Sequence, residues 1–235
     1  MTANLYSRTD PYQGYQDHKS WGQAPDSTHD PLFFEEIDSL GLKKGAKIVE
    51  VGFGEGRFLD FARRSGFDVL GLEIIPDLIK MASARGHNVS VGALGDLSDQ
   101  AGTFDLVVAF DVMEHLTTEE VAVFLNDSSL LLKEGGFILM RFPNGNSPFS
   151  LWLMNADVTH RSYLSENSIM QLARPLGFHL ERASNAKLIP PLGMIKNLRR
   201  WLSYSMRSII EMLICYSFLG RRVPLEPNLV VVLAK

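Results

Sequence analysis

Residues 47–57, Lys-Ile-Val-Glu-Val-Gly-Phe-Gly-Glu-Gly-Arg, constrain the fold of this chain more than any other stretch. They open with a short β-branched run, Ile48-Val49 and Val51, that is typical of a buried parallel strand. Glycines follow at positions 52, 54 and 56, and apolar residues then recur at helical spacing. The pattern predicts a strand, a glycine turn and a helix whose first N–H groups favour a polar or anionic ligand.

The spacing of these glycines separates two kinds of nucleotide site. A dinucleotide fingerprint requires G-x-G-x-x-G, but Arg57 occupies the place of its third glycine. The sequence Glu50-x-Gly52-x-Gly54-x-Gly56 instead resembles motif I of the class I S-adenosylmethionine-dependent methyltransferases. This resemblance implies that Glu50 and the three glycines bind the cofactor. An ordinary turn without a ligand is the alternative for this stretch taken alone.

A second strand is predicted over residues 67–73, and it ends at an acid. Glu73 follows Gly54 by 19 residues, about the separation at which a Rossmann-like fold places a carboxylate against the ribose hydroxyls. We therefore assign Glu73, together with the adjacent Ile74, to the cofactor site. The alternative is a solvated acid at a strand end.

The third predicted strand, residues 88–91, is where the resemblance departs from the family. Class I methyltransferases often carry an aspartate just beyond this strand to hold the adenine amino group. Ala93 stands at the matching position in this chain. We expect Asp96, or a backbone contact at Ala93, to take the place of the missing side chain.

The fourth predicted strand, residues 103–110, leads into a turn. The stretch F-D-x-V-x-x-x-D-V-x-E-H-L closely resembles motif IV of small-molecule methyltransferases, including the ubiquinone O-methyltransferases. The resemblance implies that Phe110 and Asp111 contact the methionine end of the cofactor. His115 falls at the carboxyl end of the strand, where open α/β sheets bind ligands. It is either a base or a residue that fixes the loop, and we favour the second role.

A polar cluster follows the fifth predicted strand, residues 137–142. The arrangement P-N-x-x-S-P-F…D-x-T-H resembles a methyltransferase subgroup common among bacterial surface-glycan enzymes. A loop at this position would overhang the methyl donor, so we predict His160 as the base and Asp157 as the group that orients it. The alternative is a histidine that only ties the loop down. Residues predicted to bind the acceptor are Asn144, Tyr163 and Arg161, the last by gripping an anionic group.

The alternation of strands and helices over residues 47–144 predicts a Rossmann-like, doubly wound α/β sheet within a single domain, 1–235. Seven strands are expected, mostly parallel, with the last at 228–234 inserted antiparallel as in the family. An N-terminal segment, 1–30, is interpreted either as a lid over the cofactor or as a segment packed on the domain. A helical insertion at 185–222 precedes the last strand.

Charge is distributed unevenly along the chain. Residues 1–184 contain 15 basic against 25 acidic side chains, whereas residues 185–222 contain 7 against 1. Within this insertion, residues 194–219 show an apolar 3–4 period opposite basic positions, which predicts a basic amphipathic helix or two shorter ones. We favour packing on its own domain or on a second subunit as a homodimer. The sharper alternative is contact with a membrane surface or a lipid-linked acceptor.

Composition limits the remaining classes. Cys215 is the only cysteine, which excludes an intramolecular disulfide and a cysteine-based zinc cluster, and we predict no metal site. The net charge of −4 argues against a general nucleic-acid binder. The first residues lack the apolar core of a signal peptide, and no apolar run approaches the roughly 20 residues of a membrane span. We therefore expect a cytoplasmic protein. If the basic amphipathic helix contacts a membrane, that contact would be at the inner membrane face.

Together these motifs predict an S-adenosylmethionine-dependent methyltransferase that acts on oxygen of a small-molecule or glycan acceptor, in polysaccharide biosynthesis. In-line SN2 transfer needs little covalent help from the protein, because alignment of acceptor, methyl group and sulfur provides most of the catalysis. Two alternatives belong to other classes. One is a nicotinamide (NAD)-dependent oxidoreductase on a similar sheet, and the other is a non-catalytic, cofactor-binding partner protein.

Overall fold

The computed structural model of the chain describes residues 27–186 and 194–235, with side chains from residue 201 onward in the second range. Most of the predicted lid, 1–30, lies outside the described residues. Its last four residues belong to a 3₁₀ turn, Ser27–His29, and to the first position of the helix that follows. Residues 187–193 of the predicted insertion lie outside the described residues as well.

Seven strands form one sheet in the order β3-β2-β1-β4-β5-β7-β6. Strand β7 is antiparallel to both of its neighbours, β5 and β6, and the other pairings are parallel. The predicted fold class, a mostly parallel Rossmann-like sheet with an antiparallel last strand, is confirmed. The strands are β1 (Lys47–Val51), β2 (Asp68–Glu73), β3 (Asn88–Val91), β4 (Phe104–Phe110), β5 (Leu132–Pro143), β6 (His179–Asn185) and β7 (Asn228–Ala234).

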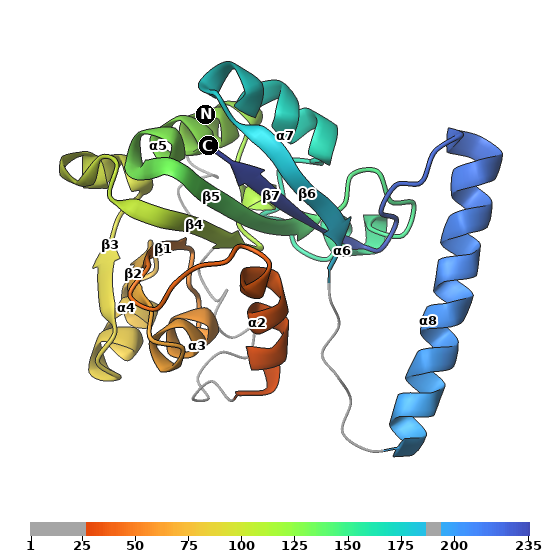
Figure 1. The fold of residues 1–235 in the computed structure, drawn as a ribbon, viewed down its shortest axis with the longest axis horizontal. Helices are drawn as coiled ribbons and strands as arrows, with labels where there is room; N and C mark the ends of the chain where they lie inside the picture. The colour runs from red at the N-terminus through yellow and green to blue at the C-terminus, as the bar shows by residue number, and fades with distance from the viewer. Residues whose placement is uncertain (1–26, 187–193) are drawn as a thin grey trace, which may run out of the picture.

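Helices cover both faces of the sheet, as Figure 1 shows, with α2, α3 and α4 on one side and α5 and α7 on the other. Each layer has its own buried apolar cluster against the sheet. The α-helices are α2 (Asp30–Asp38), α3 (Arg57–Arg64), α4 (Pro76–Ala84), α5 (Thr118–Leu131), α6 (Leu151–Asn155), α7 (Glu166–Ala173) and α8 (Met194–Ile214). Shorter turns are η1 (Ser27–His29), η2 (Leu94–Gln100), η3 (Met113–His115), η4 (Arg174–Leu176) and the π-helical η5 (Cys215–Leu219).

The chain reverses its winding direction between β1 and β4, which are neighbours at the centre of the sheet. After β1 it enters α3 on one face, and after β4 it enters α5 on the other. Connections that diverge in this way leave a crevice outside the carboxyl ends of the two strands. The two stretches that resemble motifs I and IV of the methyltransferases both end at this crevice.

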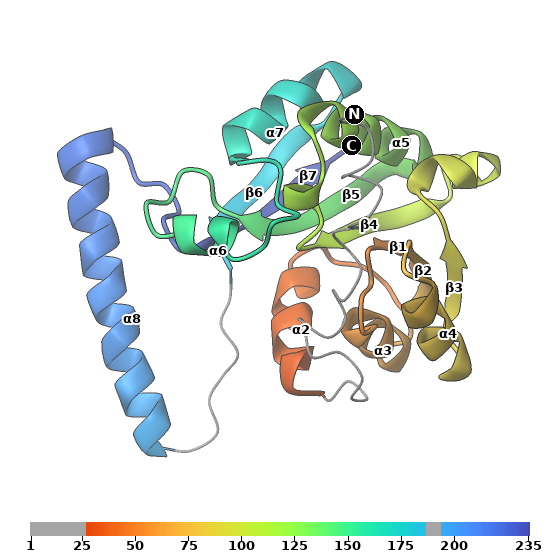
Figure 2. The ribbon, with the colours of Figure 1, turned by 180° about the vertical axis from the view of Figure 1, so that it is seen from behind.

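The insertion before β7 forms one long helix, α8, which continues into the π-helical turn η5. In Figures 1 and 2 this helix stands beside the sheet and its covering helices. Of the two predicted forms, one helix or two shorter ones, the single helix is the one observed. Across the described ranges, no helix combines the length and apolarity needed to cross a bilayer.

Candidate active site

A cavity of about 800 Å³ opens at the carboxyl ends of the central strands. Its lining comes from the turn after β1, the end of β2, the turn after β4 and the loop that follows α6. Twelve of the residues predicted for the site line it: Glu50, Gly52, Gly54, Glu73, Ile74, Ala93, Phe110, Asp111, His115, Asp157, His160 and Arg161. Gly56, Asp96, Asn144 and Tyr163 are not among the lining residues.

The glycine turn adopts backbone angles that favour glycine at each of its three positions. The φ angles are +68° at Gly52, +54° at Gly54 and +77° at Gly56, all in the left-handed region. A Cβ on Gly52 would lie 2.6 Å from Val112 Cγ2, so this position also lacks room for a side chain. Gly56 is the N-cap of α3 and shapes the turn from outside the cavity lining.

Glu73 connects this turn to the end of β2. Its Oε2 accepts the Gly54 N–H (3.1 Å), and its Oε1 accepts the N–H groups of Ile74 (2.7 Å) and Ile75 (3.2 Å). An ionised carboxylate offers about four lone-pair sites, so these three bonds leave one for a ligand hydroxyl. The side chain therefore holds the backbone of the site as well as facing the cavity.

Glu50 is one of three buried acids that line the cavity, together with Glu73 and Glu114. Only 3% of the residue is exposed, and its Oε2 has no hydrogen-bond partner among the described residues. Burial raises the pKa of Glu50 well above its ordinary value, and the nearby charge of Glu73 raises it further. A carboxyl in this position suits a cationic ligand group, which would supply the missing partner and favour the ionised form.

Asp96 does not face the cavity. Its Oδ2 accepts the Ala93 N–H (2.8 Å) at the start of the η2 turn. The side chain thus supports the turn, while Gly92 and Ala93 line the cavity. Both backbone groups of Ala93 bond to Asp96, so the group that holds the adenine, Asp96 or the Ala93 backbone, stays a prediction.

Sequence reasoning missed Arg141, which lines the cavity near the end of β5. Its Nε donates to Asp111 Oδ1 (3.0 Å), and its guanidinium carbon lies 5.1 Å from the centroid of the Phe110 ring. Burial opposes its charge, but Asp111 and then Glu114 raise the pKa of Arg141 overall. This pair accompanies an unusual backbone at Asp111, whose φ is +56°. The sequence signal that could have identified Arg141 was its position at the carboxyl end of a predicted parallel strand.

A hydrogen-bond chain runs from the loop after α6 to the turn after β4. Thr159 Oγ1 donates to Asp157 Oδ1 (2.6 Å), and the same oxygen lies 2.9 Å from His115 Nδ1. A hydroxyl has one proton, so Thr159 accepts from His115 when it donates to an ionised Asp157. His115 then carries its proton on Nδ1 and leaves Nε2 as an acceptor. Thr159 was not among the predicted site residues.

His160 lies beside His115, with ring centroids 4.8 Å apart in an edge-to-face arrangement. Its Nδ1 is 3.2 Å from the Met154 carbonyl oxygen, which accepts only, so this nitrogen is the donor. The predicted partner Asp157 therefore reaches His115 through Thr159, and His160 Nδ1 is held by a carbonyl.

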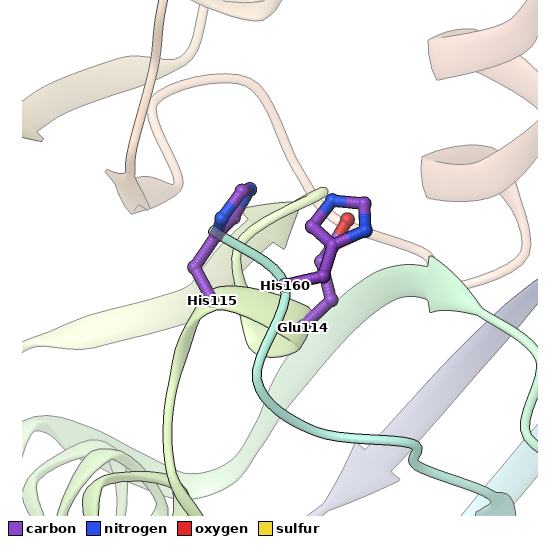
Figure 3. Close-up of side chains that lie close together, drawn as sticks. All are labelled: Glu114, His115 and His160. Atoms are coloured by element: carbon purple, nitrogen blue, oxygen red, sulfur yellow. The ribbon is translucent and has the colours of Figure 1, made fainter. Parts of the chain in front are cut away.

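Glu114 joins the two histidines at this point of the cavity, as Figure 3 shows. One ligand atom from each residue lies within 4.8 Å of the others, so a small movement of these side chains would bring all three within reach of one metal ion. The sequence predicted no metal site, whereas the fold assembles three ligand-type side chains here. Two of them come from η3 and the third from the loop after α6.

Of the three residues predicted to bind the acceptor, only one lines the cavity. Arg161 lines the cavity and forms an exposed ion pair with Glu120 (3.0 Å). Asn144 is fully buried, and its amide donates to the carbonyls of Pro224 (2.9 Å) and Glu226 (3.2 Å), so it anchors the loop. Tyr163 is exposed and lies outside the cavity lining.

Comparisons with known proteins agree with this geometry. Residues 27–183 match the family model described as a methyltransferase domain. A ubiquinone biosynthesis O-methyltransferase of Xylella fastidiosa (strain M23) is 25% identical over 186 residues, 72% of this chain and 75% of the relative. The corresponding protein of Xanthomonas oryzae pv. oryzae (strain PXO99A) is 28% identical over 147 residues, 59% of this chain and 61% of the relative.

Among solved structures, a SAM-dependent methyltransferase from Archaeoglobus fulgidus superposes with a TM-score of 0.66 at 18% identity, covering 96% of this chain and 100% of that one. At this identity the likeness concerns the fold. The family match spans the glycine turn, Glu73, His115 and His160. It favours a methyltransferase over the alternative oxidoreductase. The chain therefore belongs to the methyltransferase domain family and is an S-adenosylmethionine-dependent methyltransferase.

Proposed function

We propose that this enzyme methylates an oxygen atom of a small-molecule or glycan acceptor, with His115 as the base that takes the acceptor proton. One observation carries the assignment of the base. It is the hydrogen-bond chain Asp157–Thr159–His115, which ends at the cavity and leaves His115 Nε2 as the acceptor. A carboxylate at the far end of this chain stabilises the imidazolium that forms when the base is protonated.

The first half of the cavity would hold the cofactor. Glu73 would offer its remaining lone pair to a ribose hydroxyl, and Glu50 would pair with the ammonium group of the methionine moiety. The glycine turn lets the ligand approach the backbone, and the backbone at Ala93 faces the adenine. When bound, S-adenosylmethionine supplies a methyl group on a positively charged sulfur, which makes the methyl carbon electrophilic.

The second half of the cavity would hold the acceptor. His115 Nε2 would accept the hydroxyl proton as the acceptor oxygen takes the methyl group, and the donor would leave as a neutral thioether. The protein has to align these three atoms, because the donor is already reactive. Asp111, held by Arg141, borders the same space at the methionine end of the cofactor.

Two further points support an oxygen acceptor of this class. The curated relatives are named as O-methyltransferases, and residues 143–160 share the pattern typical of surface-glycan enzymes. Arg161 lies at the cavity, where an anionic acceptor group would compete with Glu120 for its guanidinium. We include polysaccharide biosynthesis and a cytoplasmic location in this proposal. The single, buried Cys215 agrees with a reducing compartment.

A labelled-methyl assay tests the proposal. Purified protein is incubated with S-adenosylmethionine that carries a tritiated methyl group and with a panel of catechols, nucleotide sugars and oligosaccharides. Each hydroxyl acceptor is paired with an analogue in which the hydroxyl is already methylated. We expect label only in the hydroxyl member of a pair. Transfer to amine or thiol analogues in preference to hydroxyls contradicts the proposal, and so does cofactor binding without transfer to any member.

A further inference from the structure

Helix α8 turns its polar side toward the domain. Arg207 pairs with Glu226 (Nη1–Oε2, 3.1 Å), and Glu211 accepts from the Asn185 amide (3.0 Å). Cys215, one turn further on, is fully buried against Val223 and Leu225. Residues 207, 211 and 215 are spaced four apart, so they form one stripe along the helix. That stripe is the side that faces the domain.

The opposite side of α8 is apolar and exposed. At 3.6 residues per turn, four residues of α8 lie on the arc opposite that stripe, and one residue of η5 follows them. We name them the outward face: Leu202, Met206, Ile209, Leu213 and Tyr216. Their exposed fractions range from 54% for Ile209 to 72% for Tyr216. Trp201, Ile210 and Met212 widen the exposed apolar surface on both sides of this face. A helix that packs on its own domain turns its apolar side toward that domain and its polar side toward solvent.

The charges around α8 indicate what this face contacts. Residues 185–222 carry a net charge of +6, whereas residues 1–184 carry −10. Pairs of arginines stand at both ends of the apolar stretch, Arg199-Arg200 before it and Arg221-Arg222 after it. The acid within the segment, Glu211, lies on the stripe toward the domain. An apolar face with cations at its ends is typical of helices that lie on anionic membranes.

We propose that α8 binds the surface of an anionic lipid bilayer, with its outward face at the boundary between headgroups and acyl chains. A second copy of the chain fits less well. A helix–helix seam is narrow and would leave Trp201, Ile210 and Met212 exposed, whereas a bilayer surface covers the whole arc. Pairing of two α8 helices would also bring together two segments of charge +6. The domain's own negative charge would keep the rest of the surface off the lipid.

Vesicle sedimentation tests this inference independently of the acceptor. The full chain is mixed with phosphatidylcholine vesicles that contain 30% phosphatidylglycerol or none, at low and high salt. The variant I209S/L213S removes two apolar side chains from the outward face. V123S/L130S is the matched control, because Val123 and Leu130 are comparably exposed on α5, at 58% and 60%. Unchanged affinity for S-adenosylhomocysteine shows that each variant is folded.

We expect the wild type and V123S/L130S to sediment with the anionic vesicles, and salt or the absence of phosphatidylglycerol to weaken binding. I209S/L213S should bind at least tenfold more weakly. Equal sedimentation of I209S/L213S and wild type overturns the inference. So does a wild type that ignores vesicles but forms a dimer, measured by light scattering, which I209S/L213S converts to a monomer. That result assigns the outward face to a second copy.

Discussion

The two halves of the cavity are built in different ways. In the half proposed to hold the cofactor, neighbouring strands are joined through backbone N–H groups: Gly52 N–H donates to the Leu72 carbonyl (2.8 Å), and Gly54 N–H donates to the Glu73 carboxylate (3.1 Å). In the acceptor half, side chains join segments that lie far apart in sequence, as with His115 and Thr159, 44 residues apart. The first half is therefore fixed by the sheet, and the second depends on a loop whose residues can change without altering the sheet.

The largest effect is expected from closing the cofactor half. Gly54→Val adds a branched side chain at a φ of +54°, where it strains the backbone and fills space beside the cavity. We expect calorimetry to detect no binding of S-adenosylhomocysteine. Gly45→Val is the matched control, because Gly45 also has a positive φ, +80°, and no atoms within 4 Å of an added Cβ. If Gly54→Val binds S-adenosylhomocysteine with wild-type affinity, the glycine turn is not part of the cofactor site.

His115→Ala should affect only the half of the cavity proposed for the acceptor. We expect methyl transfer to fall by ~10²–10⁴-fold, the usual contribution of a general base, with S-adenosylhomocysteine affinity within about twofold of wild type. His160→Ala should lose less activity than His115→Ala.

Two results would contradict this account of the base. One is an inactive His160→Ala beside an active His115→Ala, which would return the role to His160, the base predicted from the sequence. The other is complete loss of wild-type activity in a chelator with recovery on adding a divalent cation. That result would make Glu114, His115 and His160 metal ligands, in agreement with their spacing.

Glu73→Ala should weaken the cofactor half without abolishing it. Loss of a charge-assisted hydrogen bond to the ribose costs about 1.5–3 kcal/mol, or roughly 10–150-fold in affinity for S-adenosylhomocysteine. The variant also frees the N–H groups of Gly54, Ile74 and Ile75. Glu73→Gln keeps an acceptor oxygen and should recover part of the affinity. If Glu73→Ala binds as well as wild type, Glu73 only supports the backbone.

The smallest effect concerns the proton on Glu50. Its raised pKa means that the ligand-free protein holds this proton over a wider pH range than an exposed glutamate would. A cationic ligand group favours the ionised form, so cofactor binding should release up to about one proton near the raised pKa. Calorimetry in two buffers of different ionisation enthalpy measures this release. Glu50→Gln should release none, and an identical release in both proteins would assign the proton to another group.

The same pKa shift affects stability in a definite direction. Because folded Glu50 binds its proton more tightly than unfolded Glu50, its contribution to the free energy of unfolding declines as pH rises from the ordinary value to the raised one. Denaturant unfolding of the ligand-free protein should show this decline, and Glu50→Gln should flatten it. The cofactor should offset the decline, because it favours the ionised carboxyl.

The half of the cavity proposed for the cofactor could be predicted from the sequence more fully than the half proposed for the acceptor. The glycine turn and Glu73 are local features with fixed spacing, and a mostly parallel sheet follows from alternating strands and helices, so these parts could be predicted. The link between Asp157 and His115 depends on how a loop folds over a distant turn, and the sequence alone assigned Asp157 to His160. Arg141 was missed because it sits inside a strand pattern, and no motif marks it. The 3–4 period revealed α8 but not which of its sides faces the domain.

Calorimetry with S-adenosylhomocysteine tests the central claim, that one half of the cavity binds the cofactor and the other serves the acceptor. The titration requires no knowledge of the acceptor, and wild type, Gly54→Val and His115→Ala are compared, with NAD as the competing ligand. We predict one binding site in wild type, the same affinity in His115→Ala, no binding in Gly54→Val and no binding of NAD. Binding of NAD, or loss of S-adenosylhomocysteine binding in His115→Ala, would contradict this division.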